Sequence, residues 1–157
     1  MTAITELSQL IGKWQGTNQL WLFPGDPVRL SDSQAELRAI SHDQFTELHY
    51  TWAADGKPQE GRILLGQPSD STQVKAVWLD TWHMANQFML CEGEIDEHGA
   101  VWVKGAYAAP PGPDWGWKIV LAPHGEDTLR LLMYNITPDG EEFLAVEVAY
   151  SRQPGTD

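Results

Sequence analysis

The chain has 157 residues, of which 42% are hydrophobic and 20% charged, enough for one folded domain with a sizeable core. Its 22 acidic residues outnumber its 10 basic residues, for a net charge of −12. Because so acidic a chain repels phosphate groups, nucleic acid and anionic membranes are excluded as expected partners. The single cysteine, Cys91, excludes an internal disulfide and a cysteine-rich zinc site.

The first residues, MTAITELSQLIGKW, lack the basic segment and the continuous apolar segment of a signal peptide. No stretch of the sequence approaches the ~20 apolar residues that a membrane-spanning helix needs. We therefore expect a cytoplasmic protein.

A short helix is predicted over residues 5–11. Leu7, Leu10 and Ile11 follow the i, i+3, i+4 spacing of an apolar stripe, and Thr5 is placed to cap the first turn. Gly12 stands where a helix commonly ends in a left-handed residue.

The rest of the chain is predicted to form strands, because alternating and β-branched segments are separated by turn sequences such as Asp55-Gly56 and His98-Gly99. The predicted strands lie near 13–22, 34–41, 45–53, 61–66, 74–80, 87–95, 100–107, 115–122, 128–136 and 142–152. Closure of such a meander removes exposed strand edges. We predict an all-β fold over 1–157: one antiparallel up-and-down barrel, plugged at one end by the helix, with a loose tail at 153–157.

Two connections are longer and rich in proline and glycine, over residues 23–33 and 108–114. They are either ordinary rim loops or a lid over the mouth of the barrel.

The sequence contains 8 tryptophans, more than a solidly packed barrel core needs. Either most of them are structural or partly exposed, or they form the aromatic walls of a ligand cavity. The tryptophans are Trp14, Trp21, Trp52, Trp78, Trp82, Trp102, Trp115 and Trp117.

Gly12 and Trp14 open the first predicted strand, and Arg152 lies on the last. This combination resembles the calycin signature, in which a basic side chain from the last strand covers the indole of a Gly-x-Trp motif and closes one end of the barrel. The three residues are therefore expected to have a structural role.

The resemblance extends along the chain, through Gln59-Glu60-Gly61, Trp78-Leu79-Asp80, Asp96-x-x-Gly99, Pro138-Asp139-Gly140 and Tyr150-Ser151-Arg152. In this order the motifs resemble the bacterial domain of unknown function 1579 family, among calycin-like barrels related to heme-binding-like barrels such as nitrobindin. The resemblance implies a lipocalin-like fold with an internal cavity. It supplies no catalytic residues, because the family has no established activity.

Heme is disfavoured as a cofactor, and no other cofactor is predicted. Nitrobindin-like proteins bind heme iron through a histidine on a late strand, and the last two predicted strands contain none. His83 and His49 are the most plausible substitutes, but neither stands at the position that the resemblance implies. The remaining histidines are His42, His98 and His124.

Trp78, Asp80 and Trp82 share strand parity and so face one side. An aspartate between two tryptophans is costly to bury unless it is hydrogen-bonded. This face therefore lines a wet cavity, or Asp80 caps a turn, or its pKa is raised for use as a general acid. Asp80 and His83 could also meet in the turn, but no metal site is predicted.

The sequence favours binding of a small apolar or aromatic ligand inside the barrel. The expected ligand-binding residues are Trp52, Trp78, Asp80, Trp82, His83, Trp117 and Tyr134. One alternative is an isomerase or lyase acting on a hydrophobic or tetrapyrrole-like substrate, with Asp80 and His83 as acid and base. Another is a protein–protein interaction module with outward-facing Trp21, Trp102 and Trp115, since strand parity relative to Trp14 places Trp21 outside. The identity of the ligand and the oligomeric state are left open.

Overall fold

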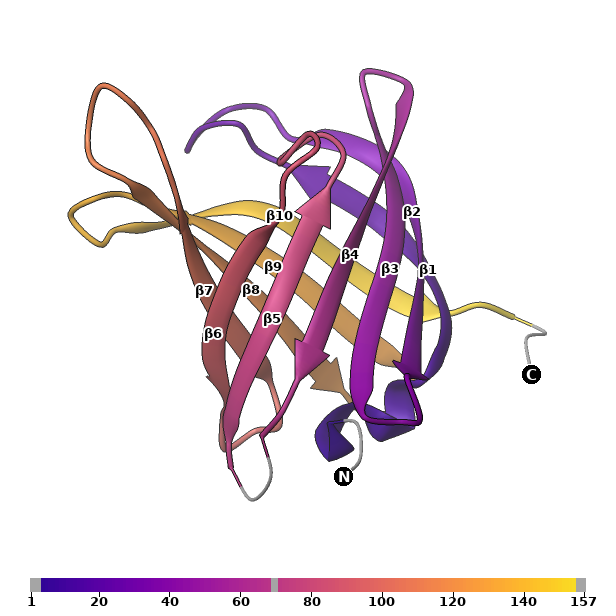
Figure 1. The fold of residues 1–157 in the computed structure, drawn as a ribbon. Helices are drawn as coiled ribbons and strands as arrows, with labels where there is room; N and C mark the ends of the chain where they lie inside the picture. The colour runs from indigo at the N-terminus through magenta and orange to yellow at the C-terminus, as the bar shows by residue number, and fades with distance from the viewer. Residues whose placement is uncertain (1–3, 69–70, 155–157) are drawn as a thin grey trace.

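The computed structural model describes residues 4–68 and 71–154, which form a short 3₁₀ helix, η1 (Thr5–Leu10), and ten strands. The strands are β1 (Gly12–Leu20), β2 (Arg29–Ile40), β3 (Phe45–Ala54), β4 (Lys57–Gly66), β5 (Gln73–Asp80), β6 (Met89–Ile95), β7 (Val101–Tyr107), β8 (Trp115–His124), β9 (Thr128–Ile136) and β10 (Glu142–Arg152). Each strand pairs antiparallel with the next, and β1 pairs with β10 to close the barrel (Figure 1). The predicted all-β barrel is confirmed.

Alternation of side chains places the core inside the barrel. In β5, for example, Val74, Ala76, Trp78 and Asp80 are buried, whereas the residues between them are exposed or half-buried. The same period of two along the other strands turns one face of each strand inward and the other to solvent. The interior is therefore filled from all ten described strands.

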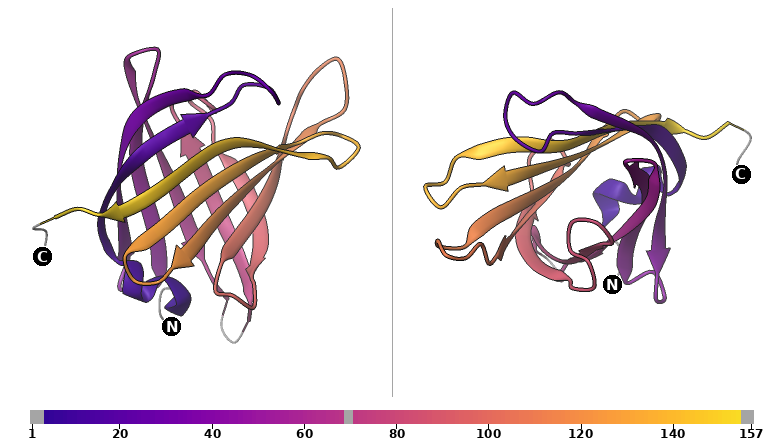
Figure 2. Two further views of the ribbon diagram at one scale, coloured as in Figure 1. Left: turned by 180° about the vertical axis from the view of Figure 1, so that it is seen from behind. Right: turned by 90° about the horizontal axis from the view of Figure 1, so that it is seen from above.

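The helix closes one end of the barrel, as seen from above in Figure 2. Ile4, Leu7 and Leu10 are each at most 1% exposed, whereas Ile11 is 39% exposed. A 3₁₀ helix has three residues per turn, so residues spaced by three share a face and Ile11 turns away. The predicted stripe is thus corrected at Ile11. The predicted cap at Thr5 is also wrong, because the N-cap is Ile4 and it makes no side-chain cap bond.

Two strands begin earlier than predicted. β2 starts at Arg29, within the predicted 23–33 connection. Its residues 29–37 pair with the whole length of β1. β4 starts at Lys57, directly after a two-residue turn in which Asp55 and Gly56 both have positive φ. Polar residues dominate both early segments, which weakens the apolar alternation by which a strand is detected.

Of the predicted tail 153–157, residues 155–157 lie outside the described residues, while the amide of Gln153 donates to the carbonyl of Lys13 at 3.1 Å. No helix within the described residues has the length and apolar character to cross a membrane.

The closed end depends on a contact between Trp14 and Arg152. The guanidinium carbon of Arg152 lies 4.6 Å from the centroid of the fully buried Trp14 ring, which confirms the predicted cation–π contact. Arg152 also donates to the carbonyl oxygens of Gln9, Ile11 and Glu126, and thereby ties the helix to the last strand.

We expect Arg152→Ala to lower the free energy of unfolding by about 1–2 kcal/mol, because the cation–π contact and the packing of the side-chain stem are both lost. Urea unfolding measures the change. Arg29→Ala is the matched control, because Arg29 makes only an exposed ion pair with Asp55 at 3.5 Å. Equal stability of the two variants would contradict a role for Arg152 in closing the barrel.

Candidate functional site

A cavity of about 570 Å³ lies at the end of the barrel opposite η1. We call it the mouth cavity. Its lining combines aromatic and small apolar side chains with a few uncharged polar ones, in the size range of small-molecule sites. The lining residues are Leu20, Trp21, Leu22, Trp78, Trp82, His83, Met84, Ala85, Gln87, Met89, Tyr107, Ala108, Trp117, Asn135 and Ala145.

The carboxylate of Asp80 holds the wall of the mouth cavity together through hydrogen bonds, and this residue is 1% exposed. One carboxylate oxygen accepts hydrogen bonds from the Tyr50 hydroxyl at 2.7 Å and from the Trp52 indole nitrogen at 3.1 Å. The other accepts from the backbone amides of Trp82 and His83 at 2.8 and 2.9 Å. A buried charge is tolerated when it is hydrogen-bonded in this way.

These bonds set the path of the chain after β5. The two amides bound by Asp80 belong to the next turn, and the amide of Met84 donates to the Asp80 carbonyl at 2.9 Å. The turn therefore brings Trp82 and His83 over the barrel mouth. Of the three roles considered for Asp80, the geometry supports the turn cap, because Asp80 does not line the mouth cavity.

The imidazole of His83 is surrounded by four indole rings. Its centroid lies 4.8 Å from Trp82, 5.3 Å from Trp117, 5.5 Å from Trp52 and 5.6 Å from Trp78. Burial lowers the pKa of His83, and this outweighs the negative charge of Asp80, which raises it. The imidazole is therefore neutral at pH 7 and faces the cavity as an uncharged polar group.

Trp117 stacks almost parallel on Trp78, with centroids 5.3 Å apart and planes 7° from parallel. The indole nitrogen of Trp78 donates to the Tyr50 hydroxyl at 3.0 Å. Among the buried side-chain nitrogen and oxygen atoms of residues 4–68 and 71–154, Nε1 of Trp117 is the one without a hydrogen-bond partner. A buried donor without an acceptor costs about 1–3 kcal/mol, so an acceptor that reached this atom would stabilise the protein.

Gly61 makes room for Tyr50. A β-carbon at position 61 would lie 2.2 Å from the Tyr50 hydroxyl oxygen and 2.3 Å from the ring carbon that carries it. The phenol therefore reaches Asp80 only across a residue with no side chain, which explains the glycine in the Gln59-Glu60-Gly61 motif.

The structure brings six of the seven expected site residues into direct contact with at least one other, and Tyr134 is the exception. Trp78, Trp82, His83 and Trp117 line the mouth cavity, while Trp52 lies behind them against His83. Asp80 stands further back as the common acceptor.

Tyr134 requires a correction, because it lies on the outer face of β9 with the Lys118 ammonium 5.2 Å from its ring. Its neighbour Asn135 lines the cavity instead and accepts a hydrogen bond from Tyr107 at 2.6 Å. The run Leu131-Leu132-Met133 is buried throughout, so alternation gave no signal for the inward face.

Trp21 also requires a correction, because it lines the mouth cavity and is not on the outer face. β1 ends at Leu20, and the amide of Trp21 donates to the Ala145 carbonyl at 2.9 Å as the chain turns. Trp102 does lie on the outer face, beside Lys104. Trp21, Trp102 and Trp115 are all half-buried, which weakens the expected interaction patch.

The residues present do not fit heme. Strands β9 and β10 contain no histidine, and His49 is paired with Glu60 outside the barrel, at 2.6 Å. His83 lines the mouth cavity, but the described lining offers no arginine or lysine for carboxylate groups of a porphyrin. Among the described residues, no group of three or more histidine, cysteine, aspartate or glutamate side chains is placed to hold a metal ion.

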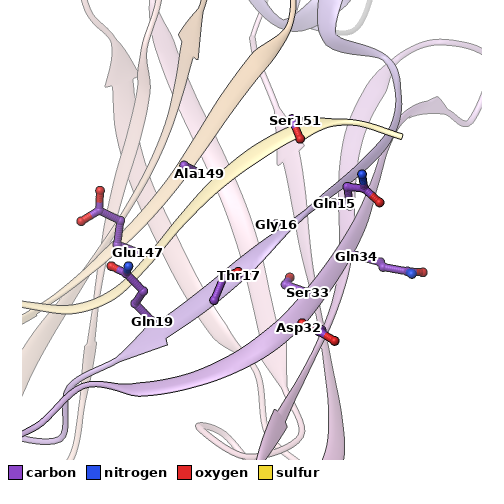
Figure 3. A pocket seen from close by; sticks show the side chains of 10 residues that line it. All are labelled: Gln15, Gly16, Thr17, Gln19, Asp32, Ser33, Gln34, Glu147, Ala149 and Ser151. Carbon is purple, nitrogen blue, oxygen red and sulfur yellow. The ribbon is translucent and has the colours of Figure 1, made fainter. Parts of the chain in front are cut away.

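A larger depression of about 670 Å³ lies outside the barrel, over β1, β2 and β10 (Figure 3). Most of its polar side chains, among them Gln15, Thr17, Asp32 and Gln34, are exposed. We assign it no ligand, because water already satisfies exposed groups of this kind and the lining contains little apolar surface.

The described residues form a closed ten-stranded antiparallel barrel. An aromatic cavity lies at one end of it. The family model "Protein of unknown function (DUF1579)" matches residues 5–152, so the chain belongs to this family. The crystal structure of Rv2717c from M. tuberculosis is similar in fold, with a TM-score of 0.65, 14% identity, and coverage of 95% of this chain and 98% of that one. No curated protein matches the sequence.

We expect Gly61→Ala to lower the free energy of unfolding by about 2–4 kcal/mol, because the new methyl group displaces Tyr50 and leaves the Asp80 carboxylate with fewer donors. Gly112→Ala is the matched control, since a β-carbon there meets its nearest atom at 3.7 Å, an ordinary contact. Chemical denaturation measures both. In a Tyr50→Ala background the cost of Gly61→Ala should largely disappear, and a full cost there would contradict the steric explanation.

We expect the imidazole of His83 to titrate below its ordinary pKa of 6.5, since burial disfavours the charged form. The unfolded chain then binds this proton at a higher pH than the folded chain does. The stability that neutral His83 contributes is therefore present above pH 6.5 and is lost as the pH falls towards the folded-state pKa. NMR titration, with the signal assigned through His83→Gln, measures the midpoint. A midpoint at or above 6.5 would be inconsistent with this environment.

Proposed function

We propose that the protein binds a small, uncharged aromatic or apolar ligand in the mouth cavity, and that its barrel is calycin-like. The observation that carries the proposal is the buried indole nitrogen of Trp117, a donor without an acceptor in the wall of an aromatic cavity. The Trp14–Arg152 contact supports the calycin-like relation.

The aromatic groups around the cavity divide into two sets. The polar atoms of Tyr50, Trp52 and Trp78 are used in hydrogen bonds that hold the wall together. His83 and Trp117 carry polar atoms that make no hydrogen bond with the described residues, and both line the cavity. A preorganised wall with a few polar groups left for the ligand is typical of a binding site.

The described lining contains no aspartate, glutamate, lysine or arginine. An anionic ligand would meet no counter-charge there, in a protein with a net charge of −12. These features favour an uncharged ligand that stacks on indole and accepts a hydrogen bond.

The geometry favours binding over the alternative of an isomerase or lyase. Both oxygens of Asp80 already accept two hydrogen bonds each, and the residue lies behind the cavity wall. Asp80 is thus a positioning residue, and His83 remains as an acid–base group without the expected partner.

We expect the neutral dye N-phenyl-1-naphthylamine to quench tryptophan emission on binding. Burial of ~200 Å² of apolar surface is worth about 5 kcal/mol before the costs of association, so micromolar to millimolar affinity is expected for a dye that is not the natural ligand. Trp117→Phe should weaken binding about tenfold, because indole surface and the N–H donor are both lost.

Trp102→Phe is the matched control, since Trp102 lies on the outer face of β7. It should leave the affinity unchanged in a fluorescence titration. Absence of saturable binding to the wild-type protein, or equal effects of the two variants, would contradict the proposed site.

A further inference from the structure

A second cavity of about 350 Å³ adjoins the mouth cavity. We call it the side groove. It lies between the start of the β1–β2 connection, the β7–β8 connection and the first residues of β10. The two cavities are adjacent, because they share the lining residues Trp21, Leu22, Tyr107, Asn135 and Ala145.

The side groove differs from the mouth cavity in chemistry. Beyond the shared residues its side chains are those of Phe23, Pro24, Ala109, Trp115, Phe143 and Leu144. Apart from the indole nitrogen of Trp115, these side chains are apolar. An apolar chain suits such a channel, because its burial is favourable and needs no hydrogen-bond partner.

The junction between the cavities is held in place by hydrogen bonds. The amide of Trp21 donates to the carbonyl of Ala145 at 2.9 Å, which fixes the β1–β2 connection to β10. The hydroxyl of Tyr107 donates to the side-chain oxygen of Asn135 at 2.6 Å. Four residues of the shared wall are therefore tied in pairs, and the wall is ordered before a ligand binds.

We propose that the two cavities together bind a two-part neutral ligand, with a carbonyl-bearing ring in the mouth cavity and an unbranched apolar chain in the side groove. This proposal rests on the proposed function. The carbonyl oxygen accepts the hydrogen bond that the indole nitrogen of Trp117 lacks. The ring stacks among the indoles, and the chain passes the Tyr107–Asn135 pair into the groove.

The test uses alkyl phenyl ketones, from acetophenone to octanophenone, in competition with N-phenyl-1-naphthylamine. Each added methylene should tighten binding about threefold until the groove is filled. Octylbenzene has the ring and the chain but no carbonyl. For the wild-type protein, octylbenzene should bind about tenfold more weakly than octanophenone. For Trp117→Phe, the two compounds should bind with equal affinity.

Ala109→Trp places an indole in the groove and should abolish the gain with chain length, so that octanophenone binds no more tightly than acetophenone. Ala106→Trp is the matched control, since Ala106 is exposed on β7 outside both cavities. It should preserve the gain. Phe143→Ala removes part of the groove wall without blocking it and should reduce the gain for each methylene.

The outcomes separate the two proposals. If no ketone or dye binds, the proposed function is wrong and this inference fails with it. If acetophenone binds but affinity does not rise with chain length, or rises equally in Ala109→Trp, the mouth cavity stands and the two-part ligand is overturned. If octylbenzene binds as tightly as octanophenone, the carbonyl acceptor is overturned.

Discussion

The carboxylate of Asp80 is the interaction on which the open end of the barrel depends. A buried charge without partners would cost several kcal/mol, so the four donors around Asp80 must be held in place for the fold to be stable. Two of them, Tyr50 and Trp52, come from β3, and two are backbone amides of the turn after β5. The charge thus joins β3 to the turn that follows β5.

The same carboxylate separates the aromatic groups that are hydrogen-bonded within the wall from those whose polar side-chain atoms are not. It binds Trp52 directly and Trp78 through the Tyr50 hydroxyl, which uses up the polar atoms of those two indoles. The rings of His83 and Trp117 pack against them, while the backbone of His83 is bound by Asp80 and that of Trp117 is paired within β8. The indole nitrogen of Trp117 makes no hydrogen bond with the described residues, although both rings are packed against their neighbours. This arrangement suits the proposed ligand binding, because a wall that is already ordered loses little freedom when a ligand binds.

The sequence predicted the barrel well, because all ten strands in the described residues alternate or carry β-rich composition between strong turn signals. It named Trp78 and Trp117, which lie on the inward faces of β5 and β8. It placed Trp82 by extending the strand parity of Trp78 and Asp80, whereas β5 ends at Asp80 and Trp82 and His83 lie in the turn that follows. It failed at Tyr134, where three consecutive buried residues hide the inward face, and at Trp21, where the strand ends one residue earlier. The Asp80 cluster was beyond reach, since its partners on β3 are 28 and 30 residues away.

The absence of a side chain at Gly61, whose place the Tyr50 ring takes, constrains which substitutions this protein can accept. A side chain at position 61 collides with the Tyr50 ring, and a smaller residue at position 50 removes a donor from Asp80. Every single substitution among these three positions therefore passes through a destabilised protein. A side chain at position 61 and the Tyr50 ring exclude each other, so a change at position 61 is expected together with a smaller residue at position 50.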